Sequence, residues 1–371
     1  MKRCVCISCF DHYTTRMQVI CNHYLKNGYD TKYIYADFDH FSKTKNRNKY
    51  RFGVKIKVPE YNNNLSPQRL YSHVVFTNGV IHYIKKFKPE VIYCMIPPNS
   101  LVKKLAGYKR ENPNVKLILD CYDLWPESFP YQINNKILGI PFKFWGDLRK
   151  NYLSSADLVI GVSEQQLNII RSELKETTAK IIKPVIDTGD IPDYKSDIEK
   201  LDFCYLGMVN HITDMDLAVT LLGKIAKGRT VNLHIIGEGQ NLSEFTERLQ
   251  DVSVNVIQHG VVFDMAEKNA IFSMCNWGLN IPREEINSTM SLKAVEYLRA
   301  GLPILNNALG DIRYIIEQDG VGINIKKDNV DEAVELVLNS SEKEMQNMHN
   351  NVIAVYKERF ANQDLDEILK V

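Results

Sequence analysis

The sequence predicts an α/β protein with two doubly wound domains, each built on a parallel sheet. Short runs of β-branched and apolar residues alternate with longer amphipathic stretches along the chain, which is typical of parallel strands joined by crossover helices. A segment rich in Pro, Gly and Asp, residues 184–200, separates two such series and is the expected linker. The length of 371 residues also favours two domains, because one compact core rarely grows that large.

The first series predicts an N-terminal domain over residues 1–186. Its helices include residues 15–26, which Gly28 closes, and residues 67–87. Its strands are expected at residues 3–9, 31–36, 54–58, 90–95, 115–120, 158–162 and 180–183.

The second series predicts a C-terminal domain over residues 187–371. Residues 342–371 should be largely helical and pack back on the first domain. The two domains are expected to face each other across a cleft at the carboxyl ends of their strands, where such sheets bind ligands. The strands are expected at residues 202–207, 231–236, 254–259, 277–281 and 303–306.

The composition indicates a folded protein that stays in the cytoplasm. Hydrophobic residues make up 44% and charged residues 25%, which argues against long disordered spans. The sequence has no run of 18 apolar residues, and its first residues lack the features of a signal peptide. Four of the eight cysteines lie at Cys4, Cys6, Cys9 and Cys21, where alternation with apolar residues favours buried thiols over a metal site.

Positive charge is concentrated at the start of the chain. Residues 1–120 hold 21 Lys and Arg against 8 Asp and Glu, a net +13, whereas the remainder holds 25 against 37, a net −12. Clusters lie at residues 43–57, 85–88 and 103–104. An anionic membrane surface and nucleic acid are both candidate partners for this basic half, and a simply solvated basic face is the alternative.

Residues 288–307, STMSLKAVEYLRAGLPILNN, contain the most informative pattern. Apolar residues every three positions predict a helix with one buried face, ended by Gly301 and begun at one of three hydroxyl residues, Ser288, Thr289 or Ser291. Lys293 and Glu296 then point away from the core.

Two interpretations of Lys293 and Glu296 are open. They can form a simple surface ion pair, with Arg299 as a further partner of Glu296. Alternatively, because the helix follows a strand through a polar loop, its N-terminus opens into the predicted cleft. Its backbone N–H groups and Lys293 would then bind a diphosphate, and Glu296 would accept hydrogen bonds from a ribose diol.

The second interpretation gains support from a family resemblance. The segments NSTMSLKAVEYLRAGLPIL, CNWGLNIP, DFCYLGMVNHITDMDLAV, LHIIGEGQNLSEF and NVIQHGVVF, with DCYDLWPESF in the first half, resemble glycosyltransferase family 4. The resemblance implies the GT-B fold of two Rossmann-like domains. It also implies transfer of a hexose or N-acetylhexosamine from a nucleotide-diphosphate donor, with retention and without a metal or other cofactor.

The same resemblance assigns roles in the C-terminal domain. Glu296 matches the second Glu of the family's E-x7-E signature and would bind the nucleotide ribose, while Ser288 stands at the position of the first Glu. Lys293 would lie near the phosphates, and Gly207 would let its loop approach the donor. The cations that many relatives carry beyond this glycine are absent from MVNHITDMD, so Lys293 and Arg283 are the expected replacements that stabilise the leaving diphosphate.

The N-terminal domain offers candidate acceptor contacts. Asp123 and Glu127 follow a strand end, where Asp123 can position acceptor or donor hydroxyls or merely cap a turn. In the first strand–helix loop, SCFDHYTTRMQ, His12 and Arg16 are candidates to meet an anionic acceptor. The alternatives are a solvated histidine and a surface arginine of the first helical turn.

Together these features predict a glycosyltransferase that acts on a lipid-linked or polysaccharide acceptor, peripherally at the inner membrane face. Its partners would be the nucleotide-sugar donor, the acceptor and anionic lipid rather than nucleic acid, and a homo- or hetero-oligomer is compatible with the sequence. Two alternatives stay open on the same fold: a nucleotide-sugar 2-epimerase, and a catalytically silent subunit that binds acceptor for an active partner.

Overall fold

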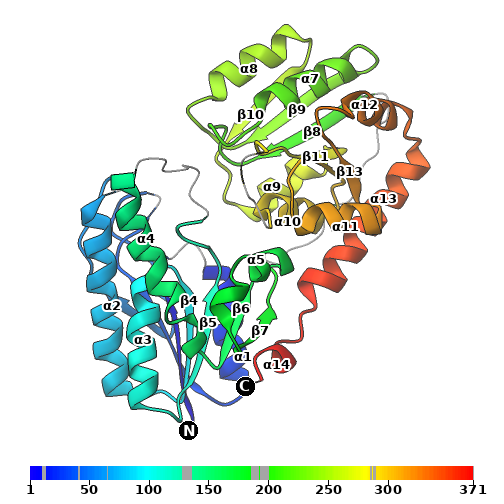
Figure 1. Cartoon of the computed structure of the whole chain (residues 1–371). Helices are drawn as coiled ribbons and strands as arrows, with labels where there is room; N and C mark the ends of the chain where they lie inside the picture. The colour runs from blue at the N-terminus through cyan, green and yellow to red at the C-terminus, as the bar shows by residue number, and fades with distance from the viewer. Residues whose placement is uncertain are drawn as a thin grey trace. The chain divides into compact units, whose positions relative to one another are not determined.

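The computed structural model describes residues 1–10, 14–40, 42–64, 66–127, 136–184, 192, 200–284, 286 and 290–370. The chain divides into two compact units (Figure 1). Unit 1 comprises Met1–Val185 together with Asp364–Val371, and unit 2 comprises Ile186–Gln363. Of the C-terminal segment expected to pack back on the first domain, only the residues from Asp364 onward belong to unit 1.

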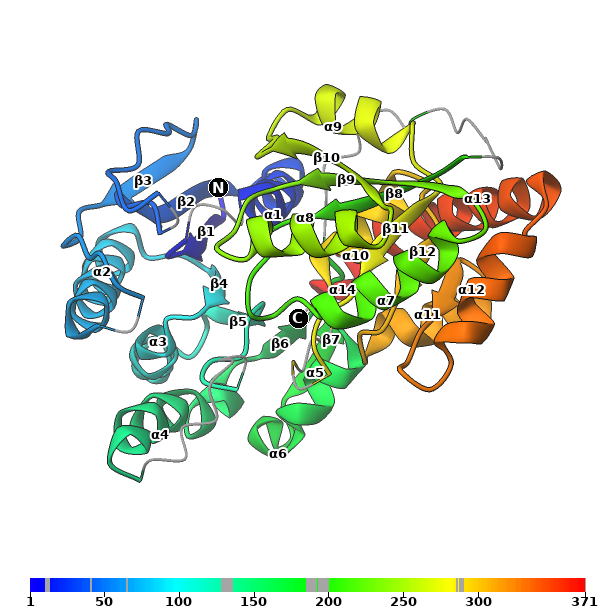
Figure 2. The same cartoon turned by 90° about the horizontal axis from the view of Figure 1, so that it is seen from above.

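Unit 1 contains a parallel sheet of seven strands in the order β3-β2-β1-β4-β5-β6-β7 (Figure 2). All seven predicted strands are confirmed, each within two residues at either end. The bounds are β1 (Arg3–Ser8), β2 (Asp30–Ala36), β3 (Gly53–Ile56), β4 (Val91–Ile96), β5 (Lys116–Cys121), β6 (Leu158–Gly161) and β7 (Thr178–Ile181).

Helices cover both faces of this sheet. One face packs under α2 and α3, which lie side by side (Figure 1), and the other under α1 and the C-terminal helix α14. Ser66 caps α2 by accepting a hydrogen bond from the Arg69 N–H, and Pro67 occupies its first turn, so the predicted helix 67–87 is confirmed. The helices are α1 (Thr14–Lys26), α2 (Pro67–Phe87), α3 (Asn99–Glu111), α4 (Lys136–Lys150), the short 3-10 turn η2 (Leu153–Ser155), α5 (Glu164–Ile169), α6 (Arg171–Leu174) and α14 (Leu365–Ile368).

Unit 2 contains a parallel sheet of six strands in the order β10-β9-β8-β11-β12-β13. The five predicted strands are confirmed, and the structure adds β13, which has only three half-buried residues and therefore shows no hydrophobic period. The bounds are β8 (Lys200–Leu206), β9 (Thr230–Ile236), β10 (Asn255–Gly260), β11 (Trp277–Asn280), β12 (Ile304–Asn306) and β13 (Gly322–Asn324).

The helices of unit 2 also form two layers. Those that pack on one face of the sheet are α7, α8 and α12, whereas α9, α10, α11 and α13 pack on the other. Their bounds are α7 (Met215–Ala226), α8 (Leu242–Asp251), α9 (Met265–Phe272), α10 (Leu292–Arg299), α11 (Asp311–Asp319), α12 (Val330–Asn339) and α13 (Glu342–Tyr356), which continues into the π-helical turn η3 (Lys357–Ala361). The fold class is thus confirmed as α/β with two doubly wound parallel sheets.

The eight cysteines are all free and buried, so the expectation of buried thiols at the start of the chain is confirmed. Burial raises the pKa of the Cys9 thiol to about 12, which keeps it protonated at neutral pH. Among the described residues, no helix combines the length and the apolar content that a bilayer crossing requires.

A buried ion pair ties α1 to the centre of the unit 1 sheet. Arg16 Nε and Nη2 donate to the two oxygens of Asp120, at 2.7 and 3.0 Å, and the side chains are 2% and 0% exposed. Arg16 Nη1 also donates to the carbonyl oxygen of Ile182 at 2.8 Å, just beyond β7. Burial raises the pKa of Tyr93, whose hydroxyl donates to Asp120 at 2.5 Å. The network therefore satisfies a charge that would otherwise be costly to bury.

Asp120→Asn should lower the free energy of unfolding by about 3–5 kcal/mol, because the guanidinium of Arg16 would stay buried without a carboxylate. Urea unfolding followed by tryptophan fluorescence measures this loss. Asp331→Asn is the matched control, since Asp331 pairs with Lys224 at the surface and is 82% exposed. That change should cost about 1 kcal/mol at most. Similar small losses for both variants would contradict the structural role of the buried pair.

Candidate active site

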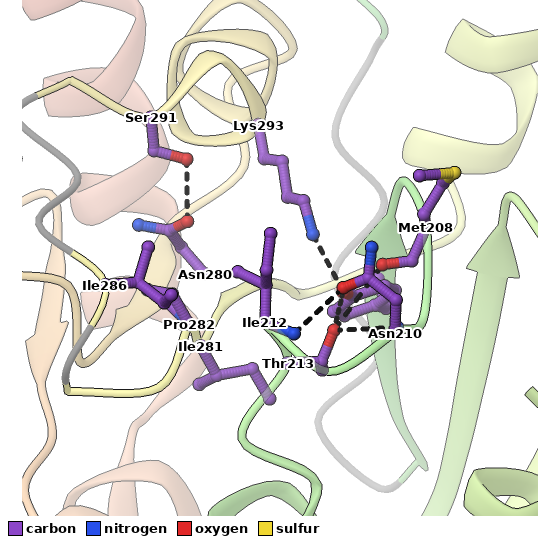
Figure 3. Close-up of a pocket in the computed structure, with 11 residues that line it drawn as sticks. Met208, Asn210, Ile212, Thr213, Asn280, Ile281, Pro282, Ile286, Ser291 and Lys293 are labelled. Carbon is purple, nitrogen blue, oxygen red and sulfur yellow. Dashed lines mark hydrogen bonds between the residues drawn. The ribbon is translucent and has the colours of Figure 1, made fainter. Parts of the chain in front are cut away.

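A cavity of about 290 Å³ lies in unit 2 at the carboxyl ends of β8 and β11 (Figure 3). The chain leaves these two neighbouring strands in opposite directions across the sheet, since β8 leads to β9 and β11 leads to β12. Such a switch point is where doubly wound sheets commonly bind ligands. The cavity is lined by Tyr205, Met208, Asn210, Ile212, Thr213, Asn280, Ile281, Pro282, Ile286, Ser291 and Lys293.

Two loops form its walls, and backbone hydrogen bonds hold them together. The Arg283 N–H donates to the carbonyl oxygen of Ile212 at 2.7 Å, and the Asp214 N–H donates to that of Ile281 at 3.0 Å. An isolated antiparallel bridge joins Thr213 and Pro282. These hydrogen bonds therefore join the described parts of the loops after β8 and β11 into one rim.

Glycines permit close packing beside this rim. Gly207 has a φ of +106°, and a Cβ atom there would lie 3.0 Å from Lys293 Cε, so a larger residue would press on that side chain. A Cβ at Gly239 would lie 2.1 Å from the carbonyl oxygen of Val209. The glycines of HIIGEGQN thus let the loop after β9 pack on the loop after β8, rather than forming a dinucleotide fingerprint.

The start of α10 is fixed by a chain of amide side chains. Ser291, one of the three predicted caps, accepts from the Ala294 N–H and donates to Asn280 Oδ1 at 2.7 Å. Asn280 Nδ2 donates to Asn306 Oδ1 at 2.7 Å, and Asn306 Nδ2 donates to Asn324 Oδ1 at 2.8 Å. These asparagines end β11, β12 and β13 at matched positions of the parallel register. The network anchors the N-terminus of α10 to the sheet.

Lys293 reaches from the first turn of α10 into the cavity (Figure 3). Its Nζ donates to the Tyr205 hydroxyl at 2.7 Å and lies 4.1 Å from the centre of that ring. Tyr205, 1% exposed, donates to the carbonyl oxygen of Met208 and shares a 2.7 Å hydrogen bond with Thr213 Oγ1. The ammonium group is therefore held in place beside Gly207, with attraction from the ring face as well as the hydroxyl.

Glu296 lies one turn further along and has different partners. Its Oε1 accepts from Lys268 Nζ at 3.1 Å, and Arg299 Nε lies 4.0 Å from its Oε2. The side chain is 17% exposed, and its buried Oε2 has no hydrogen-bond partner in the described part of the chain. The simple surface pair with Lys293 is wrong, because Lys293 bonds to Tyr205, whereas Arg299 does approach Glu296 as expected. Glu296 does not line the 290 Å³ cavity.

The remaining predicted residues of the C-terminal half fall partly outside the structure. Arg283 is exposed on the loop after β11, where its backbone helps to form the rim. Ser288 lies outside the described residues, as does His12 of the N-terminal half. Sequence patterns did not identify Tyr205, Thr213 and Lys268 as residues of the site, because each contacts its partner only in the folded chain. The repeated asparagines at strand ends were a signal for the amide network.

In unit 1 the predicted residues are tied to neighbours. Trp125 Nε1 donates to Asp123 Oδ2 at 2.5 Å. Glu127, 41% exposed, accepts two hydrogen bonds from Arg149, at 2.7 and 2.8 Å, and Arg149 also pairs with Glu173. The suggestion that Arg16 is a surface residue is wrong, since it is buried against Asp120. An acceptor role for Arg16 would require breaking that pair, so we do not retain it.

The sequence of unit 2 is similar to a known protein family. Residues 200–342 match the family model described as glycosyl transferases group 1. This match covers most of unit 2, including the cavity, Lys293 and Glu296. No curated protein sequence matches the chain.

Solved structures resemble the whole chain. Sucrose-phosphate synthase from Thermosynechococcus elongatus aligns with a TM-score of 0.69 at 14% identity, covering 99% of this chain and 96% of that one. HepE from Anabaena in complex with UDP aligns with a TM-score of 0.64 at 14% identity, covering 100% and 99%. WaaG, a glycosyltransferase of lipopolysaccharide biosynthesis, aligns with a TM-score of 0.67 at 13% identity, covering 98% and 97%. The chain therefore has the GT-B fold, and its resemblance to the group 1 glycosyl transferases is confirmed over residues 200–342.

Proposed function

We propose that the protein is a glycosyltransferase that moves a sugar from a nucleotide-diphosphate donor to a lipid-linked or polysaccharide acceptor. Unit 2 would bind the donor and unit 1 the acceptor. The observation that carries the proposal is the placement of Lys293, held by Tyr205 next to Gly207 in a cavity at the switch point of a sheet that matches group 1 glycosyl transferases. HepE, one of the similar structures, is described in complex with UDP-glucose.

The proposed chemistry needs positive charge where the diphosphate leaves. In this proposal Lys293 and the N-terminus of α10 stabilise the growing charge of the leaving group, and Arg283 on the rim adds a second cation. Fixed cations of this kind can do so without a metal. We further propose retention of the anomeric configuration, with the leaving phosphate taking the acceptor proton.

Glu296 is proposed to bind the nucleotide ribose. Its buried Oε2 is an acceptor without a hydrogen-bond partner in the described chain, and a ribose hydroxyl can supply that hydrogen bond. Lys268 and Arg299 approach the same carboxylate and would keep it oriented. Ser288 is proposed to contact the donor from the preceding loop.

In unit 1 we propose that Asp123 positions hydroxyl groups and that Glu127 contacts the acceptor. Arg149 holds the Glu127 carboxylate in one orientation while leaving it 41% exposed. His12 is retained as a further candidate at the first strand–helix loop.

A nucleotide panel tests the donor site. One nucleoside diphosphate should stabilise the purified protein in a thermal-shift assay, and Lys293→Ala should weaken its binding at least roughly tenfold, because a charge-assisted contact is lost. Glu296→Ala should remove the protection. Lys227→Ala, an exposed lysine outside the cavity, is the control and should bind as the parent does. Unchanged binding of the nucleoside diphosphate by Lys293→Ala would contradict the proposal that Lys293 contacts the phosphates.

Turnover separates the proposed enzyme from its alternatives. A transferase incubated with nucleotide sugars should slowly release free nucleoside diphosphate by hydrolysis, and faster when a suitable saccharide is added. Interconversion of two sugars would show a 2-epimerase instead. Binding without either reaction would favour a silent acceptor-binding subunit, an alternative kept open by the lack of the usual cations beyond Gly207.

We also propose that unit 1 docks on anionic membrane. Lys85 and Lys86 are exposed in the last turn of α2, and Lys103 and Lys104 are exposed on the neighbouring α3. Exposed Tyr71 and Val74 add apolar contact area on α2. Cations near an anionic surface contribute about 1 kcal/mol each, so four such lysines would together support peripheral binding.

Replacing Lys85, Lys86 and Lys88 with Glu should therefore reduce sedimentation with anionic vesicles at low salt, by tenfold or more. The matched control reverses three exposed lysines of unit 2, Lys326, Lys327 and Lys343, and should leave sedimentation unchanged. Equal sedimentation of both variants would count against this membrane face.

A further inference from the structure

The cavity of unit 2 has two chemically different sides. On one side Lys293, Tyr205, Thr213 and Asn210 present polar groups. The other side is apolar: Ile281, Pro282 and Ile286 lie together, apart from the Lys293 ammonium (Figure 3). Two further apolar side chains complete the lining, Met208 and Ile212.

The polar side chains close to the apolar side are already engaged. Asn280 Oδ1 accepts from Ser291, and Asn280 Nδ2 donates to Asn306 Oδ1, each at 2.7 Å. A sugar hydroxyl placed against Ile281 and Ile286 would lose water and gain poor hydrogen bonds in return, which is unfavourable. A methyl group at the same place would instead bury apolar surface.

The expected orientation of the donor follows from the position of the Lys293 ammonium on the polar side of the cavity. If the proposed function holds, the diphosphate lies against Lys293 and the N-terminus of α10. Glu296, the proposed ribose contact, does not line this cavity. With the nucleoside outside the cavity, the sugar is the part of the donor that extends along it toward the isoleucines. The apolar side would thus contact a substituent of the sugar ring.

Resting on the proposed function, we propose that the apolar side of this cavity selects a donor sugar that carries a methyl group. Two kinds of sugar present one: a 6-deoxyhexose, through its C6 methyl, and an N-acetylhexosamine, through its acetamido group. Unsubstituted hexoses would bind with the same diphosphate contacts but without this burial.

The test uses the full chain and three donors that share one nucleotide, the one that best stabilises the protein. The sugars are glucose, 6-deoxyglucose and N-acetylglucosamine. Apparent Kd values from thermal shifts, and rates of donor hydrolysis, are compared for each. At least one methyl-bearing donor should be preferred over glucose roughly tenfold, the usual discrimination of an apolar pocket. The preferred donor shows whether the C6 methyl or the acetamido group occupies the apolar side.

Two variants locate the selectivity. Ile286→Thr and Ile286→Asn each place a polar group on the apolar side, at a half-buried residue of the cavity lining. Both should reduce the preference to about threefold or less while the free nucleoside diphosphate binds as before. Ile257→Asn is the matched control, at an isoleucine that is 39% exposed and outside the cavity lining, and should keep the parent preference.

Equal use of all three donors by the parent would overturn the inference while leaving the proposed function intact. A preference that survives both Ile286→Thr and Ile286→Asn would also overturn it, since the selectivity would then arise elsewhere. Failure of every nucleoside diphosphate to stabilise the protein would instead reject the proposed function itself.

Discussion

The hydrogen bond from Ser291 to Asn280 decides where α10 begins, and the candidate site depends on that position. Ser291 uses one hydroxyl for two tasks, because it accepts from the first turn of the helix and donates to the end of β11. An asparagine amide both donates and accepts, so Asn280, Asn306 and Asn324 can pass hydrogen bonds along three neighbouring strand ends. A shift of this network would move every side chain in the first two turns of α10. Buried networks of this kind specify one arrangement because each partly satisfied alternative is costly.

Within α10 the fold separates two charges that the sequence places close together. Lys293 turns to Tyr205 on β8, whereas Glu296 turns to Lys268 on α9. Had they paired with each other, as neighbours on a helix surface commonly do, each would have neutralised the other at little gain in stability. Because other elements supply their partners, the cation and the carboxylate each keep capacity for a further contact. One short helix therefore carries a cation and a carboxylate that face different partners.

The sequence was sufficient for the fold and for part of the site. The buried strand β4 is a continuous apolar run, VIYCMI, so its position follows from composition alone, whereas β13 is too short and too exposed to be distinguished from a loop. Lys293 and Glu296 were found through their place on a helix that follows a strand. Their partners were not, because Tyr205 lies 88 residues and Lys268 lies 28 residues away along the chain. Arg16 was misjudged for the same reason: its partner Asp120 is 104 residues distant, and no local pattern indicates that the two meet.

The last residues of the chain complete the core of unit 1. Leu369 is buried among side chains of α1 and the unit 1 sheet, and Leu365 and Ile368 pack against the same cluster. Unit 1 is therefore a discontinuous domain, interrupted by the whole of unit 2. On the ribosome, where chains emerge from the N-terminus onward, the first 185 residues leave the tunnel long before α14 is made. Until then, the apolar side chains of unit 1 that Leu365, Ile368 and Leu369 contact lack these partners, and unit 1 reaches its final state only after unit 2 has been synthesised.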